Sequence, residues 1–325
     1  EDLFKRVTVI PDGKNHGMIF VLDWSGSMCY ELLATVKQLI NLTSFCKKVQ
    51  IPFEVYAFTN EWGAAQRAID NDAALPKETY YRSYYDINED ELEKNKFHID
   101  SWFYLMNFVS SRSNGKDYER MCQNLFREAA LHRRYGAYTP TIGLGLSGTP
   151  LNESIVMLNF LLPKFKKENN LQKVNVCILT DGEACSSAYG AEYDRGEGEV
   201  VIRARRIDYG VALRDRKTGR TYEGFTYSGT TNVFLRQLRD RNPDVNVLGF
   251  RILSGSSLMN FVSNYGSEDC NYGEIQKQWK KEKSAVIKSP AGFTELYAIN
   301  NKALDNDTEF VVKDNAKKGD ITRAF

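Results

Sequence analysis

The chain has 325 residues, of which 42% are apolar and 26% are charged, proportions that are ordinary for a globular protein. Its 43 basic and 42 acidic side chains nearly cancel, so the sequence predicts neither a broadly basic surface for nucleic acid nor a broadly acidic one. No apolar run approaches the ~20 residues of a membrane-spanning helix, and no signal peptide is visible. We therefore expect a cytoplasmic protein that binds neither nucleic acid nor membrane.

The most informative segment begins with an apolar run at residues 18–22, which predicts a buried strand. The turn that follows, Asp-Trp-Ser-Gly-Ser-Met, sets Asp23, Ser25 and Ser27 at alternate positions. In an open α/β sheet, ligands bind at the carboxyl ends of the strands, where this turn lies. Oxygen donors on a short loop suit a hard divalent cation that keeps some of its waters. The alternative is a polar turn that only caps the next helix.

Strand and helix patterns alternate along the rest of the chain. The expected strands lie at about 53–59, 173–180, 245–252 and 293–299. The expected helices lie at about 32–48, 116–134 and 231–240, with another from residue 257. This alternation predicts an α/β fold, with a doubly wound and mostly parallel sheet flanked by helices.

Two later segments bring polar side chains to the same edge of this sheet. Thr149 precedes an apolar helical pattern and is followed by Pro150, so its alternative role is a plain N-cap. Asp181 directly follows the strand at 173–180, where acidic residues are also common as caps. Together the three segments place two carboxylates and three hydroxyls on one rim: Asp23, Ser25, Ser27, Thr149 and Asp181.

This set resembles the metal-ion-dependent adhesion site (MIDAS) of the von Willebrand factor A family. The D-x-S-x-S pattern of that site matches Asp23, Ser25 and Ser27, its distant threonine matches Thr149, and its strand-end aspartate matches Asp181. The resemblance implies that the three hydroxyls bind a divalent metal directly, while the two aspartates act largely through coordinated water. The expected ion is Mg²⁺, with Mn²⁺ and Ca²⁺ as alternatives, and an Asp or Glu of a protein partner completes its coordination.

The phrases Gly-Thr-Pro-Leu and Asp-Gly around Thr149 and Asp181 look closest to the A domain of the cobaltochelatase T subunit, whose relatives occur in bacteria and tailed phages. That resemblance implies a non-catalytic subunit that works with a MoxR-type AAA+ ATPase to remodel a client or assist metal chelation. The chain has no G-x-x-x-x-G-K-[ST] phosphate loop of its own. The alternatives are a stand-alone adhesion or assembly module, and a metal-dependent hydrolase for which Glu153 and Glu183 are the nearby acidic candidates.

The resemblance also implies a division of the chain. Residues 1–16 are a lead-in, 17–300 an A domain with two insertions, and 301–325 a tail that adds an edge strand, binds a neighbouring subunit or is only loosely tethered. The first insertion, at about 71–138, holds tyrosines 80, 81, 84 and 85, an acidic patch and Trp102. We expect its aromatic residues to pack a subsidiary core; a binding surface is the alternative.

The second insertion, at about 199–228, predicts strands at 200–202 and 207–213 and a basic hairpin tip at 214–220. This hairpin is either a solvated edge or a contact for an acidic partner.

The spacing of the cysteines and histidines argues against disulfide pairs and zinc sites. The six cysteines form no C-x-x-C pair, so we expect free and mostly buried thiols. The three histidines lie far apart in the sequence and lack the spacing of zinc ligands. Cys185, four residues after Asp181, is expected either near the metal rim or as a small core thiol.

Overall fold

A computed structural model describes residues 15–60, 92–99, 103–137, 141, 143–196, 198–226, 229–253, 257–266, 270–288 and 292–304. The tyrosines at 80–85, the first part of the acidic patch, Trp102 and most of the tail therefore lie outside the described residues.

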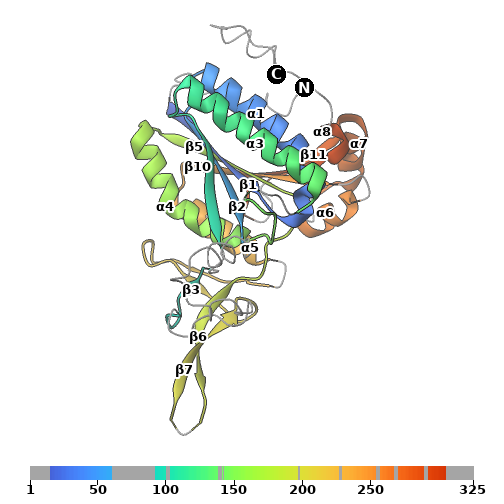
Figure 1. Cartoon of the computed structure of the whole chain (residues 1–325). Helices are drawn as coiled ribbons and strands as arrows, with labels where there is room; N and C mark the ends of the chain where they lie inside the picture. The colour runs from blue at the N-terminus through green and yellow to red at the C-terminus, as the bar shows by residue number, and fades with distance from the viewer. Residues whose placement is uncertain are drawn as a thin grey trace.

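The body of the protein is a seven-stranded sheet (Figure 1). Its strands are β1 (His16–Asp23), β2 (Phe53–Thr59), β4 (Tyr104–Ser110), β5 (Lys173–Thr180), β10 (Val245–Leu253), β11 (Ser284–Lys288) and β12 (Glu295–Asn300). They run in the order β11-β12-β10-β5-β1-β2-β4. The inner strands from β12 to β2 are parallel, whereas the edge strands β4 and β11 are antiparallel to their neighbours. The fold is thus mixed α/β with a mostly parallel central sheet, as predicted.

Helices lie on both faces of this sheet (Figure 1). They are α1 (Leu32–Lys48), α3 (Gly115–Tyr135), α4 (Leu151–Asn169), α5 (Thr230–Arg241), α6 (Leu258–Tyr265), α7 (Tyr272–Glu282) and the short α8 (Asn301–Leu304). Within the described ranges, none of them combines the length and the apolar character that a membrane span requires.

Strand β1 shows why the central strands are apolar throughout. Ile19 and Val21 pack in the core cluster that contains α4 and α5, while Phe20 and Leu22 pack in the cluster that contains α1 and α3. Alternate side chains of a strand point to opposite faces, so residues 18–22, which lie between two helical layers, are apolar in succession.

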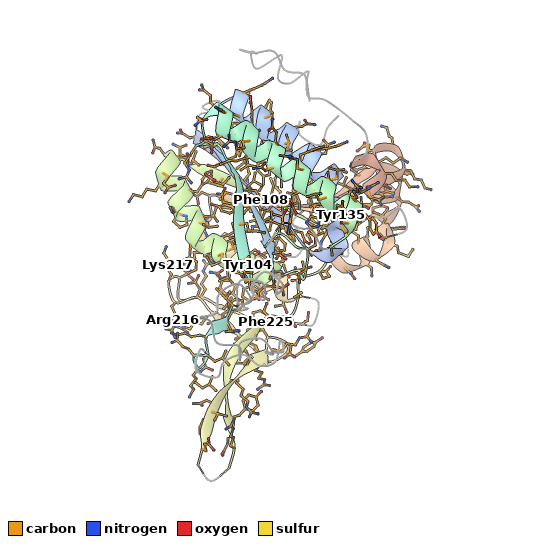
Figure 2. The ribbon with its side chains drawn as sticks, viewed as in Figure 1. Tyr104, Phe108, Tyr135, Arg216, Lys217 and Phe225 are labelled. Carbon is orange, nitrogen blue, oxygen red and sulfur yellow. The ribbon has the colours of Figure 1, made fainter. Side chains whose placement is uncertain are left out.

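Strand β4 comes from the aromatic part of the stretch at 71–138 and was not predicted. It pairs with β2, and α3 from the same stretch packs in the cluster with α1. Phe108 of β4 lies edge-on to Trp24, with 4.9 Å between ring centroids, while Tyr104 lies at the exposed start of the strand (Figure 2). This part of the stretch therefore belongs to the main body.

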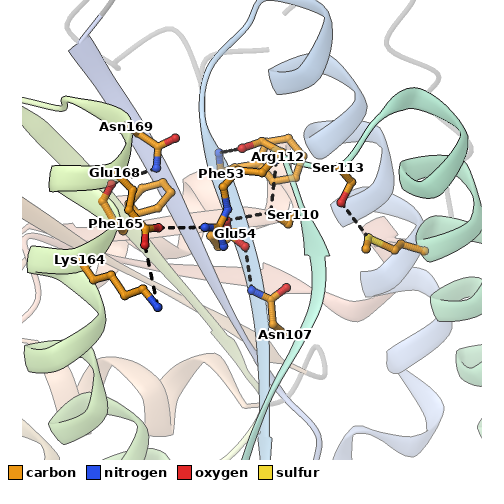
Figure 3. A network of polar contacts seen from close by, with 12 residues as sticks. Phe53, Glu54, Asn107, Ser110, Arg112, Ser113, Lys164, Phe165, Glu168 and Asn169 are labelled. Atoms are coloured by element: carbon orange, nitrogen blue, oxygen red, sulfur yellow. Dashed lines mark hydrogen bonds and ion pairs between the residues drawn. The ribbon is translucent and has the colours of Figure 1, made fainter.

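Polar contacts fasten β4 to its neighbour (Figure 3). Glu54 of β2 is only 1% exposed. Its Oε2 accepts a hydrogen bond from Asn107 Nδ2 at 2.7 Å, and its Oε1 accepts from Ser110 Oγ at 2.8 Å. Arg112 donates through Nε to Glu54 Oε1 at 3.1 Å and through Nη1 to Glu168 of α4 at 2.9 Å. The edge strand is thus held by a buried carboxylate beside a β-bulge.

Beyond the sheet, β6 (Ala188–Asp194) and β7 (Val200–Arg206) form an antiparallel hairpin that projects from the body (Figure 1). The short β3 (Phe97–His98) pairs with the other side of β6. The prediction of a strand at 207–213 is wrong except at its last residue, because the chain turns there and enters a strand only at β8 (Leu213–Arg214).

Strand β8 pairs with β9 (Thr221–Tyr222) around the predicted basic turn. Arg216 and Lys217 lie exposed on this turn (Figure 2), and Asp215 Oδ1 holds it by accepting from the backbone N–H of Lys217 at 2.8 Å. The predicted basic tip at 214–220 is therefore the turn of the short β8–β9 hairpin.

Candidate metal centre

The sheet brings the two predicted aspartates to one edge. Asp23 is the last residue of β1, and Asp181 directly follows β5. The two strands are parallel neighbours, with Leu22 aligned with Leu179. The turn after Asp23 carries Ser25 and enters a short 3₁₀ helix, η2 (Gly26–Tyr30). Both carboxylates and both serines therefore meet at the carboxyl edge of the sheet.

Hydrogen bonds join these side chains. Ser27 Oγ donates to Asp181 Oδ1 at 2.8 Å, and the hydroxyl oxygens of Ser25 and Ser27 are 3.1 Å apart. Thr180, the last residue of β5, donates through Oγ1 to Asp23 Oδ2 at 2.5 Å. Thr180 was not among the predicted site residues. Its position directly before Asp181 was the only signal for it in the sequence.

The Thr149 loop lies against the other two segments. Ser147 forms a parallel bridge with Ser25, and the Gly26 N–H donates to Ser147 O at 2.7 Å. The Thr149 carbonyl accepts from the Cys185 N–H at 2.8 Å, and the Thr149 N–H donates to Cys185 Sγ at 3.2 Å. Of the two roles considered for Cys185, the structure thus supports the position beside the rim, which the sequence favoured less.

Thr149 does not cap the helix that follows it. Helix α4 begins at Leu151 after Pro150, with no side-chain cap hydrogen bond. The alternative role of Thr149 as a plain N-cap is therefore wrong, because the helix starts two residues after it and its hydroxyl makes no cap hydrogen bond.

Burial shapes the electrostatics of this rim. The Asp23 side chain is 0% exposed. Burial raises its pKa from 3.8 to about 7, although hydrogen bonds from Thr180 and Ser25 act to lower it. Burial also raises the pKa of Asp181, against the hydrogen bond from Ser27 and the charge of Arg251. Without a cation, the folded protein thus disfavours the charged form of both carboxyls.

One carboxylate oxygen of this rim lacks a hydrogen-bonding partner within the described residues. Asp23 Oδ1 is buried and accepts no hydrogen bond from them. A buried carboxylate oxygen without a donor is costly, and a bound cation would satisfy it. The donors around it are hydroxyls and a second carboxylate, all oxygens, as Mg²⁺ and Ca²⁺ prefer. The residues present therefore fit a divalent cation.

Arg251 of β10 supplies positive charge beside this rim. Its side chain is only 4% exposed, and its Nη2 donates to Tyr265 Oη at 2.6 Å and lies 3.1 Å from Glu183 Oε2. Tyr265 in turn donates to Glu183 Oε1. Arg251 and Tyr265 were not predicted as site residues, because the sequence pattern around a single arginine in a strand does not indicate which side chains it contacts.

Helix α3 anchors the loop that leads to Thr149. The buried His132 has Nδ1 2.9 Å from Gly136 O and Nε2 2.8 Å from Leu144 O. Trp24, between Asp23 and Ser25 in the chain, donates through Nε1 to the same Leu144 carbonyl at 2.9 Å. The loop is thus held by the helix and by the turn of the site.

We expect His132→Ala to lower the free energy of unfolding by about 2–4 kcal/mol, because it leaves a cavity and removes the contacts of the buried ring with the Gly136 and Leu144 carbonyls. Urea denaturation followed by tryptophan fluorescence measures the change. Gln123→Ala, at an exposed position of the same helix, is the control. A loss below about 1 kcal/mol would mean that the loop does not depend on His132.

All six cysteines are free, and four of them are buried. The expectation of free, mostly buried thiols is therefore confirmed.

No family model and no curated protein matches this chain. Among solved structures it is similar to the pilus adhesin SpaC of Lactobacillus rhamnosus GG in its open conformation, at 12% identity over 73% of this chain and 24% of that one, with a TM-score of 0.38. It is also similar to proximal thread matrix protein 1 of the mussel byssus, at 10% identity over 84% of this chain and 49% of that one, with a TM-score of 0.34. The chain thus spans about a quarter and about half of these structures, and likeness of this degree carries no argument about function.

These findings correct the assignment to the von Willebrand factor A family and, within it, to the relatives of the cobaltochelatase T subunit. No family model supports it. Within the described ranges there is also no group of three or more His, Cys, Asp or Glu side chains that could hold a metal. The five rim residues include only two carboxylates, so a cation there would rely on hydroxyls and water.

Proposed function

We propose that this chain is a binding protein that holds a divalent cation, Mg²⁺ in the first place, and uses it to bind a carboxylate of a protein partner. The residues that would hold the cation are Asp23, Ser25, Ser27, Thr149 and Asp181. The observation that carries the proposal is the buried Oδ1 of Asp23, which has no hydrogen-bonding partner in the described part of the chain, on a rim where Ser25, Ser27 and Asp181 are linked through their side-chain oxygens.

Charge supports a role in binding. The three hydroxyls are neutral, so the only negative charges among the five residues come from the two aspartates. A cation held in this way would keep a strong attraction for an external carboxylate, and Mg²⁺ usually retains open positions for waters or ligands. Helices on both faces of a mostly parallel sheet support a doubly wound plan, in which ligands bind at this edge.

Catalysis has less support. Hydrolysis at a metal needs an activated nucleophile and a base placed beside it. Glu183 is engaged with Arg251 and Tyr265. Glu153 is buried in the first turn of α4. Neither carboxylate is therefore presented as a base, and the hydrolase alternative has no observation in its favour.

The test is capture of proteins from an extract of the native cells by the immobilised chain, in Mg²⁺ or in EDTA. We expect a partner to be retained in Mg²⁺ and lost both in EDTA and with Asp23→Ala, whose fold is checked by circular dichroism. Retention that is independent of metal would mean that this rim is not the main contact. The AAA+ ATPase stays a prediction; its recovery would support that partner, whereas a structural protein would favour an assembly module.

We expect Thr149→Ala to weaken Mg²⁺ affinity by about tenfold or more and partner binding in parallel, because one oxygen donor is lost. The unfolding free energy should change by less than about 1 kcal/mol, since the hydroxyl does not cap α4. Calorimetry and thermal denaturation measure the two effects. Thr218→Ala, on the exposed β8–β9 turn, is the control, and equal Mg²⁺ affinity in both variants would contradict the assignment of Thr149.

A further inference from the structure

An open pocket of about 390 Å³ adjoins the proposed metal centre. Ser27 and Asp181 line one side of it, and Asn260 and Asn264 of α6 line another. Pockets that hold small ligands or short segments typically measure about 300–1,000 Å³. Because Ser27 and Asp181 belong both to the pocket and to the rim, a group bound at the cation would border this pocket.

The base of the pocket is fixed by internal contacts. Arg251, Tyr265 and Glu183 all line the pocket and are bonded to one another. The Glu183 carboxylate and the Tyr265 hydroxyl are committed to this network, whereas Arg251 Nε is buried without a hydrogen-bonding partner among the described residues. Recognition of an occupant therefore depends on the other polar groups of its walls.

Asn260 and Asn264 are such groups. Both are exposed on α6, and the side chain of neither makes a hydrogen bond within the described part of the chain. Residues four apart on a helix lie about 5–6 Å from each other on one face. In an extended chain, alternate residues are about 6.6–6.8 Å apart and turn their N–H and C=O groups to the same side. A carboxamide donates and accepts hydrogen bonds, so this pair matches the main chain of an extended segment.

One large exposed side chain lies in the pocket wall, and another follows the pocket residues along the chain. Tyr30 of η2 lines it and is 71% exposed, and Met259, next to Asn260 on α6, is 62% exposed. Tyrosine and methionine are enriched in protein interfaces. Exposed side chains of this kind suit a protein segment better than a free small acid.

We propose that this pocket binds an extended acidic segment of a protein. The Asp or Glu of the segment binds at the cation, and the adjoining main chain is hydrogen-bonded by Asn260 and Asn264. The carboxylate contact rests on the proposed function, whereas the recognition of the main chain belongs to the pocket alone. A free carboxylate such as acetate makes only the first of these contacts, so the two contributions are separable.

The probe is a displayed library of linear heptapeptides with a fixed central aspartate, selected on the wild-type chain in Mg²⁺. Selected peptides are synthesised, and their affinities are measured by calorimetry for wild type, for the Asn260→Ala, Asn264→Ala double variant, and for Ser263→Ala, an exposed control on the same helix. We expect the double variant to bind peptide about tenfold more weakly or worse, as the loss of two hydrogen bonds implies. Its affinities for Mg²⁺ and acetate should equal those of wild type, and Ser263→Ala should bind peptide normally. N-methylation of the peptide bonds beside the aspartate should weaken binding to wild type as well.

Equal peptide affinity in wild type and double variant would overturn the proposal. If Mg²⁺ and acetate bind but no linear peptide is selected, the pocket inference fails and the proposed function stands. If Mg²⁺ itself does not bind the wild-type chain, the proposed function fails and the inference fails with it.

Discussion

Glu54→Ala is expected to lower the free energy of unfolding by about 3–5 kcal/mol, because removing one partner of a buried charged network leaves the others uncompensated. Asn107 and Ser110 would each lose an acceptor, and Arg112 would keep only its contact with Glu168. Urea denaturation measures the loss. In the Glu54→Ala variant, native-state hydrogen exchange should show β4 opening more readily than β1, because the lost network joins this edge strand to the sheet.

Glu168→Ala is the matched control for this variant. Glu168 bonds the same arginine but is partly exposed, so we expect its removal to cost less than about 1 kcal/mol. If the two variants lost similar amounts of unfolding free energy, the burial of Glu54 would not be the reason that the network stabilises the fold. An unchanged exchange rate in β4 would show that the strand is held mainly by its backbone ladder.

The central strands were predictable because each is buried on two faces. The apolar runs at 53–59 and 173–180 match β2 and β5 at both ends. Edge strands carry a weaker pattern, since one side faces solvent. In β4 only Val109 is buried, and β11 has just five residues, so neither stood out from its surroundings.

The sequence could predict those features of the rim that follow from the order of the strands in the sheet. Asp23 and Asp181 end strands that lie side by side, and this follows once the strands are placed in a parallel sheet. Arg251 is aligned with Thr180 across β5 and β10. That register is a tertiary feature, so the sequence pattern could indicate the strand at 245–252 but not the charge that it delivers to the rim.

Asp23→Asn is expected to have opposite effects on stability and on metal binding. Burial raises the pKa of Asp23 in the folded chain from 3.8 to about 7, so the folded state holds this proton more tightly than the unfolded state does. The stability that comes from the protonated form is present below about pH 4 and is lost as the pH rises to about 7. The difference between the two pKa values corresponds to about 4 kcal/mol at most. At pH 8 in EDTA, the neutral asparagine should therefore be more stable than wild type by about 2–4 kcal/mol.

Addition of Mg²⁺ should reverse that order. A cation at Asp23 Oδ1 stabilises the ionised wild type by mass action, whereas the asparagine variant supplies no charge and should show no calorimetric binding. Unfolding is measured from pH 5 to 8, in EDTA and in Mg²⁺, with Glu119→Gln as an exposed control for the loss of one negative charge. If Asp23→Asn binds Mg²⁺ as wild type does, the assigned site is wrong. If the variant is less stable than wild type in EDTA at pH 8, then Asp23 is satisfied within the fold, and the unpartnered oxygen no longer argues for a cation.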